Sequence, residues 1–212
     1  MGKSKSGGGG GSRDNRHWGE GNTDGFMGHT DPEKLQEQVG NASWENRLTD
    51  DQKHALDMYL NRDNAYRDIN NALRKGQEAS PETQKLIDDL GAALDDSYLK
   101  QNITVTRRSS ASLLGGADTP AKIREMYGKV VVDPGFASST AKVDSGAYAN
   151  TRPMEYHIKV PGRTRGVGAY VQDLANFEEH EFLFNKGSAF RVLGAYSRGG
   201  KTHVNMEYVG RR

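Results

Sequence analysis

The sequence contains no cysteine, which excludes disulfide bonds, thiolate catalysis and zinc sites built from cysteine. No apolar run reaches about 20 residues, the length of a membrane-spanning helix. The formal net charge is only +1, so the chain lacks the basic excess typical of proteins that bind nucleic acid or an anionic membrane. We therefore expect no membrane partner, and a nucleic-acid partner is disfavoured.

Hydrophobic residues are also scarce, at 34% of the 212 residues, and much of this deficit lies in the first ~45 residues. This segment contains a glycine run from Gly7 to Gly11, which is typical both of a native flexible tail and of an engineered linker. The start lacks the apolar core of a secretory signal. We predict a flexible, glycine-rich tail over residues 1–45 and one catalytic domain over residues 46–212.

The first half of the domain is predicted to be helical. Apolar residues at helical spacing predict helices over residues 50–61 and 63–75, and a third helix begins after Ser80. Thr49 and Gln52 form a capping box at the start of the first helix.

After residue 101 the apolar period changes from helical to alternating. Helices followed by strands favour an α+β fold over an alternating parallel sheet. Strands are predicted at residues 103–107, 129–132, 136–140, 154–160, 167–171, 180–184, 189–197 and 202–209.

The stretch Asn176–Phe184 is predicted to be a loop that turns into a strand, and Glu179 and Glu181 lie where the two meet. Glu179 and Glu181 alternate with His180, and alternate strand residues point to the same side, so both carboxylates are predicted to share one face. The apolar run that follows Glu181 indicates burial. Buried acids are costly unless they are used, and we interpret these two as a catalytic pair.

Arg107, Ser138 and the Glu179–Glu181 segment occur in an order that resembles the Arg-Ser-Glu class of mono-ADP-ribosyltransferases. The chain is most similar to the catalytic components of binary actin-modifying toxins and to vegetative insecticidal proteins. Tyr66–Leu73 and Ile158–Pro161 match further segments of that family, and the likeness covers residues 46–212. It implies amino-terminal helices packed on a two-sheet, mainly antiparallel β-sandwich.

The resemblance also implies roles for these residues. Glu181 is expected to stabilise the oxocarbenium-like charge that develops on the ribose of NAD. Arg107 is expected to bind the NAD pyrophosphate, and Ser138 to hydrogen-bond Glu181. Glu179 is expected to orient or deprotonate the acceptor. In this family a glutamate there accompanies arginine acceptors, whereas glutamine accompanies asparagine.

Four further site residues follow from the same resemblance. Tyr66 and Asn70 are predicted to bind NAD beside the cleft, and Phe177 and Tyr170 to belong to the substrate loop. The segment Gln172–Glu178 is the predicted target-recognition element.

The chain departs from the family pattern at two places. Residues Ser138–Thr140 read Ser-Ser-Thr where relatives usually have Ser-Thr-Ser, and His157 stands where insecticidal relatives carry an arginine that aids NAD binding. The remaining histidines are too scattered in sequence for metal-ligand spacing, so no metal is expected. They are His17, His29, His54, His180 and His203.

Taken singly, each motif has a commoner explanation, since Glu-x-Glu on an exposed strand is usually a solvated face. The joint occurrence of these motifs favours an enzyme that transfers ADP-ribose from NAD to an arginine of a target protein. NAD is expected to be a substrate and the only cofactor. We expect a toxin-like monomer that acts in the cytoplasm of a target or host cell, with a phage particle, a secretion system or an immunity protein as further partner. Two alternatives stay open: an enzyme of this class that modifies nucleic acid or only hydrolyses NAD, and a non-catalytic NAD-fold module of a virion or adaptor.

Overall fold

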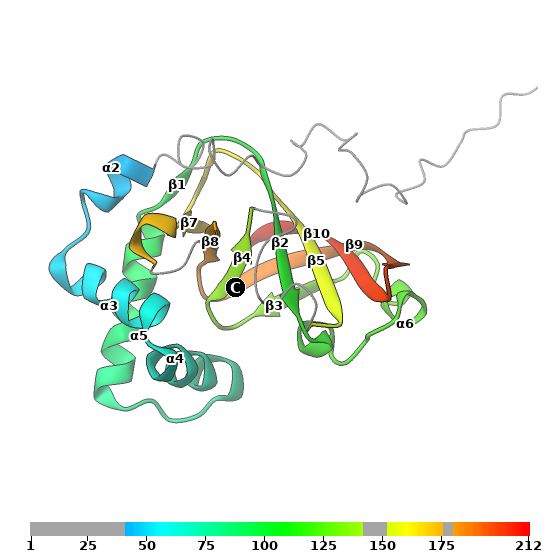
Figure 1. Ribbon diagram of the computed structural model, residues 1–212, viewed down its shortest axis with the longest axis horizontal. Helices are drawn as coiled ribbons and strands as arrows, with labels where there is room; N and C mark the ends of the chain where they lie inside the picture. Colours follow the sequence, from blue (N-terminus) through cyan, green and yellow to red (C-terminus); the bar gives the residue numbers. More distant parts are fainter. Residues whose placement is uncertain (1–40, 142–151, 176–179) are drawn as a thin grey trace, which may run out of the picture.

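The computed structural model describes residues 41–141, 152–175 and 180–212. Figure 1 shows helices gathered on one side and strands on the other, with the short helix α6 (Pro120–Arg124) at the far end of the sheet. Helices precede strands along the chain, which confirms the predicted α+β class. Within the described ranges, no helix is long and apolar enough to span a membrane.

Capping and periodicity determine the helical layer, as the sequence predicts. The predicted bounds of α3 and α4 are confirmed, and Thr49 and Gln52 form the reciprocal capping box that satisfies two backbone N–H groups at the start of α3. The layer contains α2 (Asn41–Glu45), α3 (Asp50–Asn61), α4 (Asp63–Lys75) and α5 (Pro81–Asp95).

Helix α2 lies within the residues predicted as tail. Its Trp44 is 2% exposed, and the indole N–H donates to the carbonyl of Ala93 in α5 at 2.7 Å. The packed part of the chain therefore includes residues before position 46. Residues 1–40 lie outside the described ranges.

The strands form an eight-stranded sheet in the order β3-β9-β10-β5-β2-β4-β8-β7 and a separate pair, β1 with β6. The bounds are β1 (Tyr98–Leu99), β2 (Ile103–Ser109), β3 (Val130–Asp133), β4 (Ala137–Thr140), β5 (Met154–Val160), β6 (Thr164–Arg165), β7 (Gly168–Tyr170), β8 (Glu181–Phe184), β9 (Ser188–Arg198) and β10 (Lys201–Arg211).

Neighbouring strands of the large sheet are antiparallel except β5 and β10, which are parallel. The two predicted sheets are parts of one, because Thr106 of β2 pairs with Thr140 of β4, the one pair between these strands among the described residues. One part contains β3, β9, β10, β5 and β2, and the other contains β4, β8 and β7. The narrow junction between them positions the site.

Strand β8 is buried on both sides, which explains the uninterrupted apolar run after Glu181. Successive side chains of a strand point to opposite faces, so Leu183 packs with Phe136 and the helices while its neighbours enter the other core. The second core contains an aromatic cluster with ring centroids 5.1–6.1 Å apart. Its members are Phe182, Phe184, Phe190 and Tyr208.

Candidate active site

A cavity of about 580 Å³ is lined by residues of α3, α4 and the strands at the β2–β4 junction. Among the described residues, its lining includes five arginines and two acids, Asp63 and Glu181, and guanidinium groups at a cavity wall suit an anionic ligand. The structure brings together at this cavity four of the residues predicted from sequence: Tyr66, Arg107, Ser138 and Glu181. Sequence reasoning assigned no role to several other lining residues, among them Tyr59, Arg62, Arg74, Thr106 and Arg108.

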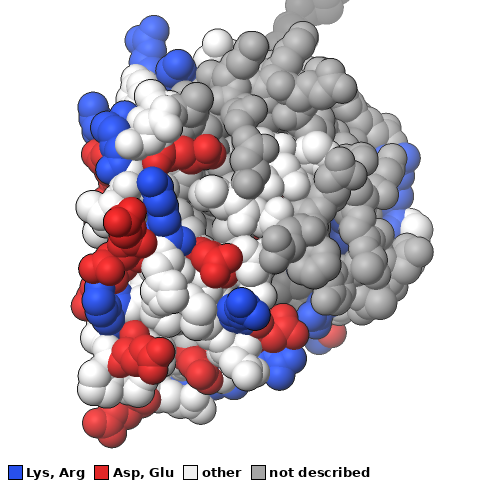
Figure 2. All heavy atoms as spheres, turned by 60° about the vertical axis from the view of Figure 1, so that its left-hand side comes forward, with Lys and Arg blue, Asp and Glu red and all other residues white. Residues whose placement is uncertain are grey.

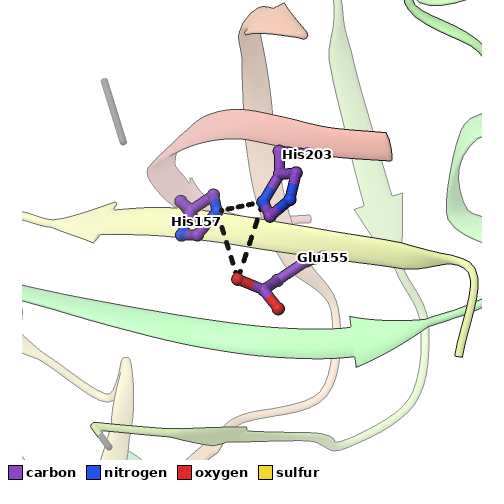
Figure 3. Close-up of side chains that lie close together, drawn as sticks. All are labelled: Glu155, His157 and His203. Carbon is purple, nitrogen blue, oxygen red and sulfur yellow. Dashed lines mark hydrogen bonds and ion pairs between the residues drawn. The ribbon is translucent and has the colours of Figure 1, made fainter. Parts of the chain in front are cut away.

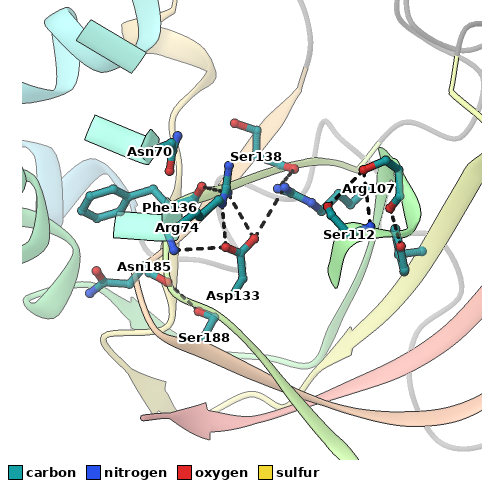
Figure 4. Close-up of polar contacts among 12 residues, drawn as sticks. Asn70, Arg74, Arg107, Ser112, Asp133, Phe136, Ser138, Asn185 and Ser188 are labelled. Carbon is teal, nitrogen blue, oxygen red and sulfur yellow. Dashed lines mark hydrogen bonds and ion pairs between the residues drawn. The ribbon is translucent and has the colours of Figure 1, made fainter. Parts of the chain in front are cut away.

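Arg107 extends from β2, and its guanidinium is held at two points. One terminal N–H group donates to the carbonyl of Ser138 at 3.0 Å, and the other terminal nitrogen lies 3.6 Å from a carboxylate oxygen of Asp133 (Figure 4). The side chain is 13% exposed. Residues of β3 and β4 therefore fix the planar guanidinium group of Arg107 at the cavity wall. The parallel N–H donors of such a group suit phosphate oxygens.

Asp133 binds a second arginine from the helical layer. Arg74 of α4 donates to its two carboxylate oxygens at 2.8 and 3.1 Å, and also to the carbonyl of Phe136 at 2.6 Å. Burial opposes the charge of Arg74, but the hydrogen bonds and charge of Asp133 outweigh it and raise the pKa of Arg74. The sequence indicated Asp133 only as the first residue of an Asp-Pro-Gly turn, so its role was missed.

Gly135, in that turn, leaves room for this ion pair. Its N–H donates to Asp133 at 3.0 Å. A Cβ atom at Gly135 would lie 2.4 Å from the Oδ1 atom of Asn70 and 2.7 Å from the Nε atom of Arg74. A side chain at this position would thus displace Arg74, which explains why glycine suits it.

Glu181 begins β8 and is 8% exposed. The register of β4 and β8 places Thr140 directly opposite Glu181, and Ser138 two residues further along the same face. The hydroxyl of Ser139 points to the other side and donates to the carbonyl of Phe182 at 2.7 Å. Two hydroxyl groups, from Ser138 and Thr140, therefore share the face of Glu181, and the predicted bond from Ser138 to Glu181 stays a prediction.

The predicted strand alternation does not extend back from Glu181 to Glu179. Strand β8 starts at Glu181, and His180 before it has a left-handed backbone with φ of 48°. This conformation is uncommon outside glycine and interrupts the extended chain at His180, so strand alternation gives no support for a face shared by the two acids, which stays a prediction. Glu179 and Phe177 themselves lie outside the described residues.

His180 is held by two neighbours from the preceding segment. Its ring nitrogen Nδ1 lies 2.9 Å from the hydroxyl of Tyr170, and its backbone N–H donates to the side chain of Gln172. Tyr170 is 5% exposed and lies in β7, so its ring belongs to the core and is not among the cavity-lining residues. The contacts with Tyr170 and Gln172 therefore fix His180, the residue directly before Glu181.

Tyr59 and Tyr66 form an aromatic wall of the cavity, with ring centroids 5.2 Å apart. Tyr59 donates to the carbonyl of Phe136 at 3.2 Å, and burial raises its pKa well above the ordinary range, so it stays neutral. Asn70 donates to the hydroxyl of Tyr59 at 3.0 Å and is 5% exposed. Asn70 therefore supports the wall from behind and is not among the residues that line the cavity.

The described residues also contain one group that could hold a metal ion, Glu155, His157 and His203. The sequence spacing of the histidines gave no sign of it, because His157 and His203 come from β5 and β10. The expectation that no metal is bound is not tested by a structure without ligands.

A scan against protein-family models matches residues 37–209 to the ADP-ribosyltransferase exoenzyme model. The match covers most of the chain. The chain belongs to the ADP-ribosyltransferase exoenzyme family. Its reaction class is ADP-ribosyl transfer. No protein sequence of curated function matches the chain.

Solved structures of this family share the fold. Plx2a, an ADP-ribosyltransferase toxin from Paenibacillus larvae, is 21% identical, with a TM-score of 0.71 over 84% of this chain and 96% of Plx2a. C3stau2 from S. aureus with NAD is 17% identical, with a TM-score of 0.71 over 86% and 97%. BECa of a C. perfringens binary enterotoxin, with NADH, is 18% identical, with a TM-score of 0.73 over 84% of this chain. The chain spans 47% of BECa.

Replacing Asp133 with asparagine tests whether this carboxylate holds the site together. We expect Asp133→Asn to lower the free energy of unfolding by about 3 kcal/mol, because Arg74 and Arg107 lose their shared counter-charge in a largely buried position. Urea denaturation measures the change. Asp118→Asn is the control, since its pair with Lys122 is exposed and screened by water, so its loss should leave the free energy of unfolding almost unchanged. Equal small effects of the two substitutions would contradict the assigned role.

Proposed function

We propose that the chain transfers ADP-ribose from NAD to an arginine side chain of a target protein, releasing nicotinamide. The observation that carries this proposal is the convergence of Arg107, Ser138 and Glu181 at one cavity from three separate strands. Each motif alone is common, but a basic cavity that contains all three suits a ligand with a pyrophosphate and a reacting ribose.

The reaction breaks the bond between C1′ of the ribose and the nicotinamide nitrogen, and nicotinamide leaves as a neutral molecule. Positive charge develops on the ribose as this bond breaks. Glu181 stabilises that charge, and its burial at the cavity wall strengthens the interaction because little water competes. Arg107 binds the pyrophosphate, and the hydroxyl of Ser138 orients Glu181.

An acceptor nitrogen then bonds to C1′ and gives up a proton. We assign the proton acceptor to Glu179, since a glutamate two residues before the catalytic one accompanies arginine acceptors in the family that the motifs resemble. The left-handed backbone of His180, directly before Glu181, supports different roles for the two acids, because strand β8 begins only at Glu181. Phe177 and the rest of the segment Gln172–Glu178 are proposed to contact the target.

A protein acceptor is favoured over nucleic acid by the surface charge. Figure 2 shows the helical side of the molecule, where acidic and basic side chains of the described residues are mixed. Nucleic-acid binding usually requires a basic stripe that contacts successive phosphates. A toxin-like role is supported by the relatives, since Plx2a is a toxin and BECa belongs to a binary enterotoxin.

The first test replaces Glu181 with glutamine, which keeps the shape and removes the charge. With labelled NAD and a cell lysate, the wild type should label protein, and Glu181→Gln should reduce both labelling and nicotinamide release by at least about 100-fold. Glu125→Gln, at an exposed position on the other end of the sheet, is the control and should retain full activity. Equal consumption of NAD by wild type and Glu181→Gln would favour the non-catalytic alternative.

The second test separates the two acids. Glu179→Gln should lose transfer to arginine while it still releases nicotinamide, because water replaces the acceptor at a ribose that Glu181 still stabilises. Mass spectrometry of labelled target peptides and chromatography of nicotinamide measure the two outcomes in one reaction. If Glu179→Gln transfers to arginine at the wild-type rate, the assignment of Glu179 fails while the role of Glu181 stands.

A further inference from the structure

Two histidines and a glutamate converge on the parallel strand pair β5 and β10. The register places His203 of β10 beside Glu155 of β5, and His157 follows two residues later on the same face of β5. Figure 3 shows the three side chains directed at one another from the two strands. Glu155 and His157 are each 7% exposed, so the group is largely shielded from water.

The distances within this group fit the ligand shell of a small divalent cation. Nε2 of His157 lies 3.0 Å from Nδ1 of His203, and Oε1 of Glu155 lies 3.4 and 3.6 Å from these two nitrogens. The point equidistant from the three atoms is about 1.9 Å from each, and zinc binds imidazole nitrogen and carboxylate oxygen at about 2.0–2.2 Å. An ion placed slightly out of their plane would reach all three ligands at normal bond lengths.

Neighbouring groups fix the orientation of two of these ligands. The Nε2 atom of His203 lies 3.3 Å from the carbonyl of Arg198, which can only accept a hydrogen bond, so Nε2 carries the proton and Nδ1 directs its lone pair at the group. The ring of Tyr196 stacks on His203 at a centroid distance of 4.9 Å. The second oxygen of Glu155 accepts from Nε of Arg108 at 3.1 Å. Such outer contacts are typical of metal-binding histidines and carboxylates.

We propose that Glu155, His157 and His203 bind a divalent transition-metal ion such as Zn²⁺. Two imidazoles and one carboxylate supply three ligands, and water completes the tetrahedral shell that zinc prefers. The ion would connect β5 to β10 and hold Glu155, which in turn holds Arg108 at the cavity wall. This site is separate from Arg107, Ser138 and Glu181, and the proposal does not depend on the proposed reaction.

A metal-free hydrogen bond between the two histidines is the competing explanation. It accounts for the 3.0 Å contact but does not explain why Oε1 of Glu155 faces both rings. Charge-assisted bonds between N–H and carboxylate usually measure about 2.7–2.9 Å, whereas Oε1 lies 3.4 and 3.6 Å from the ring nitrogens. A shared cation bonds to all three atoms at these separations.

The test uses the untagged full chain, freed of metal with a chelator and titrated with Zn²⁺ or Co²⁺. We expect one ion per chain by calorimetry, and a visible Co²⁺ absorption of a four-coordinate site that Zn²⁺ abolishes. Zn²⁺ should also raise the Tm of the wild type, since an ion that binds only the folded chain stabilises it. Absence of binding at one equivalent would overturn the proposal.

Three variants locate the ion. His203→Ala and His157→Ala should each weaken Zn²⁺ binding by at least about 100-fold, more than the loss of an outer contact costs. The double variant His17→Ala/His29→Ala is the control for ligands outside the described ranges and should bind as the wild type does. Glu155→Gln, which keeps the side-chain shape, gives the same answer if an alanine variant does not fold. Wild-type affinity in the ligand variants, or loss of binding in the control, would place the ion elsewhere and refute the site.

Discussion

The ion pairs of Asp133 with Arg74 and Arg107 connect the helical layer to the sheet at the cavity wall. Figure 4 shows this carboxylate between the two guanidinium groups. A largely buried carboxylate is stable only when it is paired, so Asp133 constrains both arginines at once. Glycine at position 135 is required by the same contact, because a Cβ atom there would collide with Arg74.

The narrow junction of β2 and β4 explains how residues distant in sequence reach one cavity. Among the described residues, Thr106 and Thr140 are the pair that joins β2 to β4, and the side chains of Arg107 and Ser138 line the cavity beside it. Strand β8 continues the second part and places Glu181 opposite Thr140. Because β8 is packed between two apolar cores, Glu181 is held by the core and not by a mobile surface segment.

Local signals predicted the local structure well. The capping box of Thr49 and Gln52 and the helical spacing of apolar residues were sufficient for the bounds of α3 and α4. The Arg-Ser-Glu order also predicted that Arg107, Ser138 and Glu181 lie together, as the cavity lining confirms.

The contacts that sequence reasoning did not predict join segments that are distant in the chain. Asp133 is 59 residues from Arg74, and His203 is 46 residues from His157, so no spacing rule joins them. Alternation failed at His180 because one left-handed residue interrupts the extended chain, and the enrichment of histidine at positive φ is too weak to predict that conformation at one position. Asn70, which the resemblance assigns to NAD binding, donates to Tyr59 behind the cavity wall, and its contact with NAD stays a prediction.

The central claim is that Arg107, fixed by Asp133 and β4, binds the pyrophosphate of NAD. Calorimetric titration of NAD into wild type and Arg107→Lys tests it most directly, because lysine keeps the charge but loses the planar fork. Arg47→Lys, at an exposed position paired with Asp96, is the matched control. We predict that Arg107→Lys raises the Kd for NAD by at least about 10-fold, the cost of one charge-assisted hydrogen bond, while Arg47→Lys leaves it unchanged. An unchanged Kd for Arg107→Lys would contradict the claim.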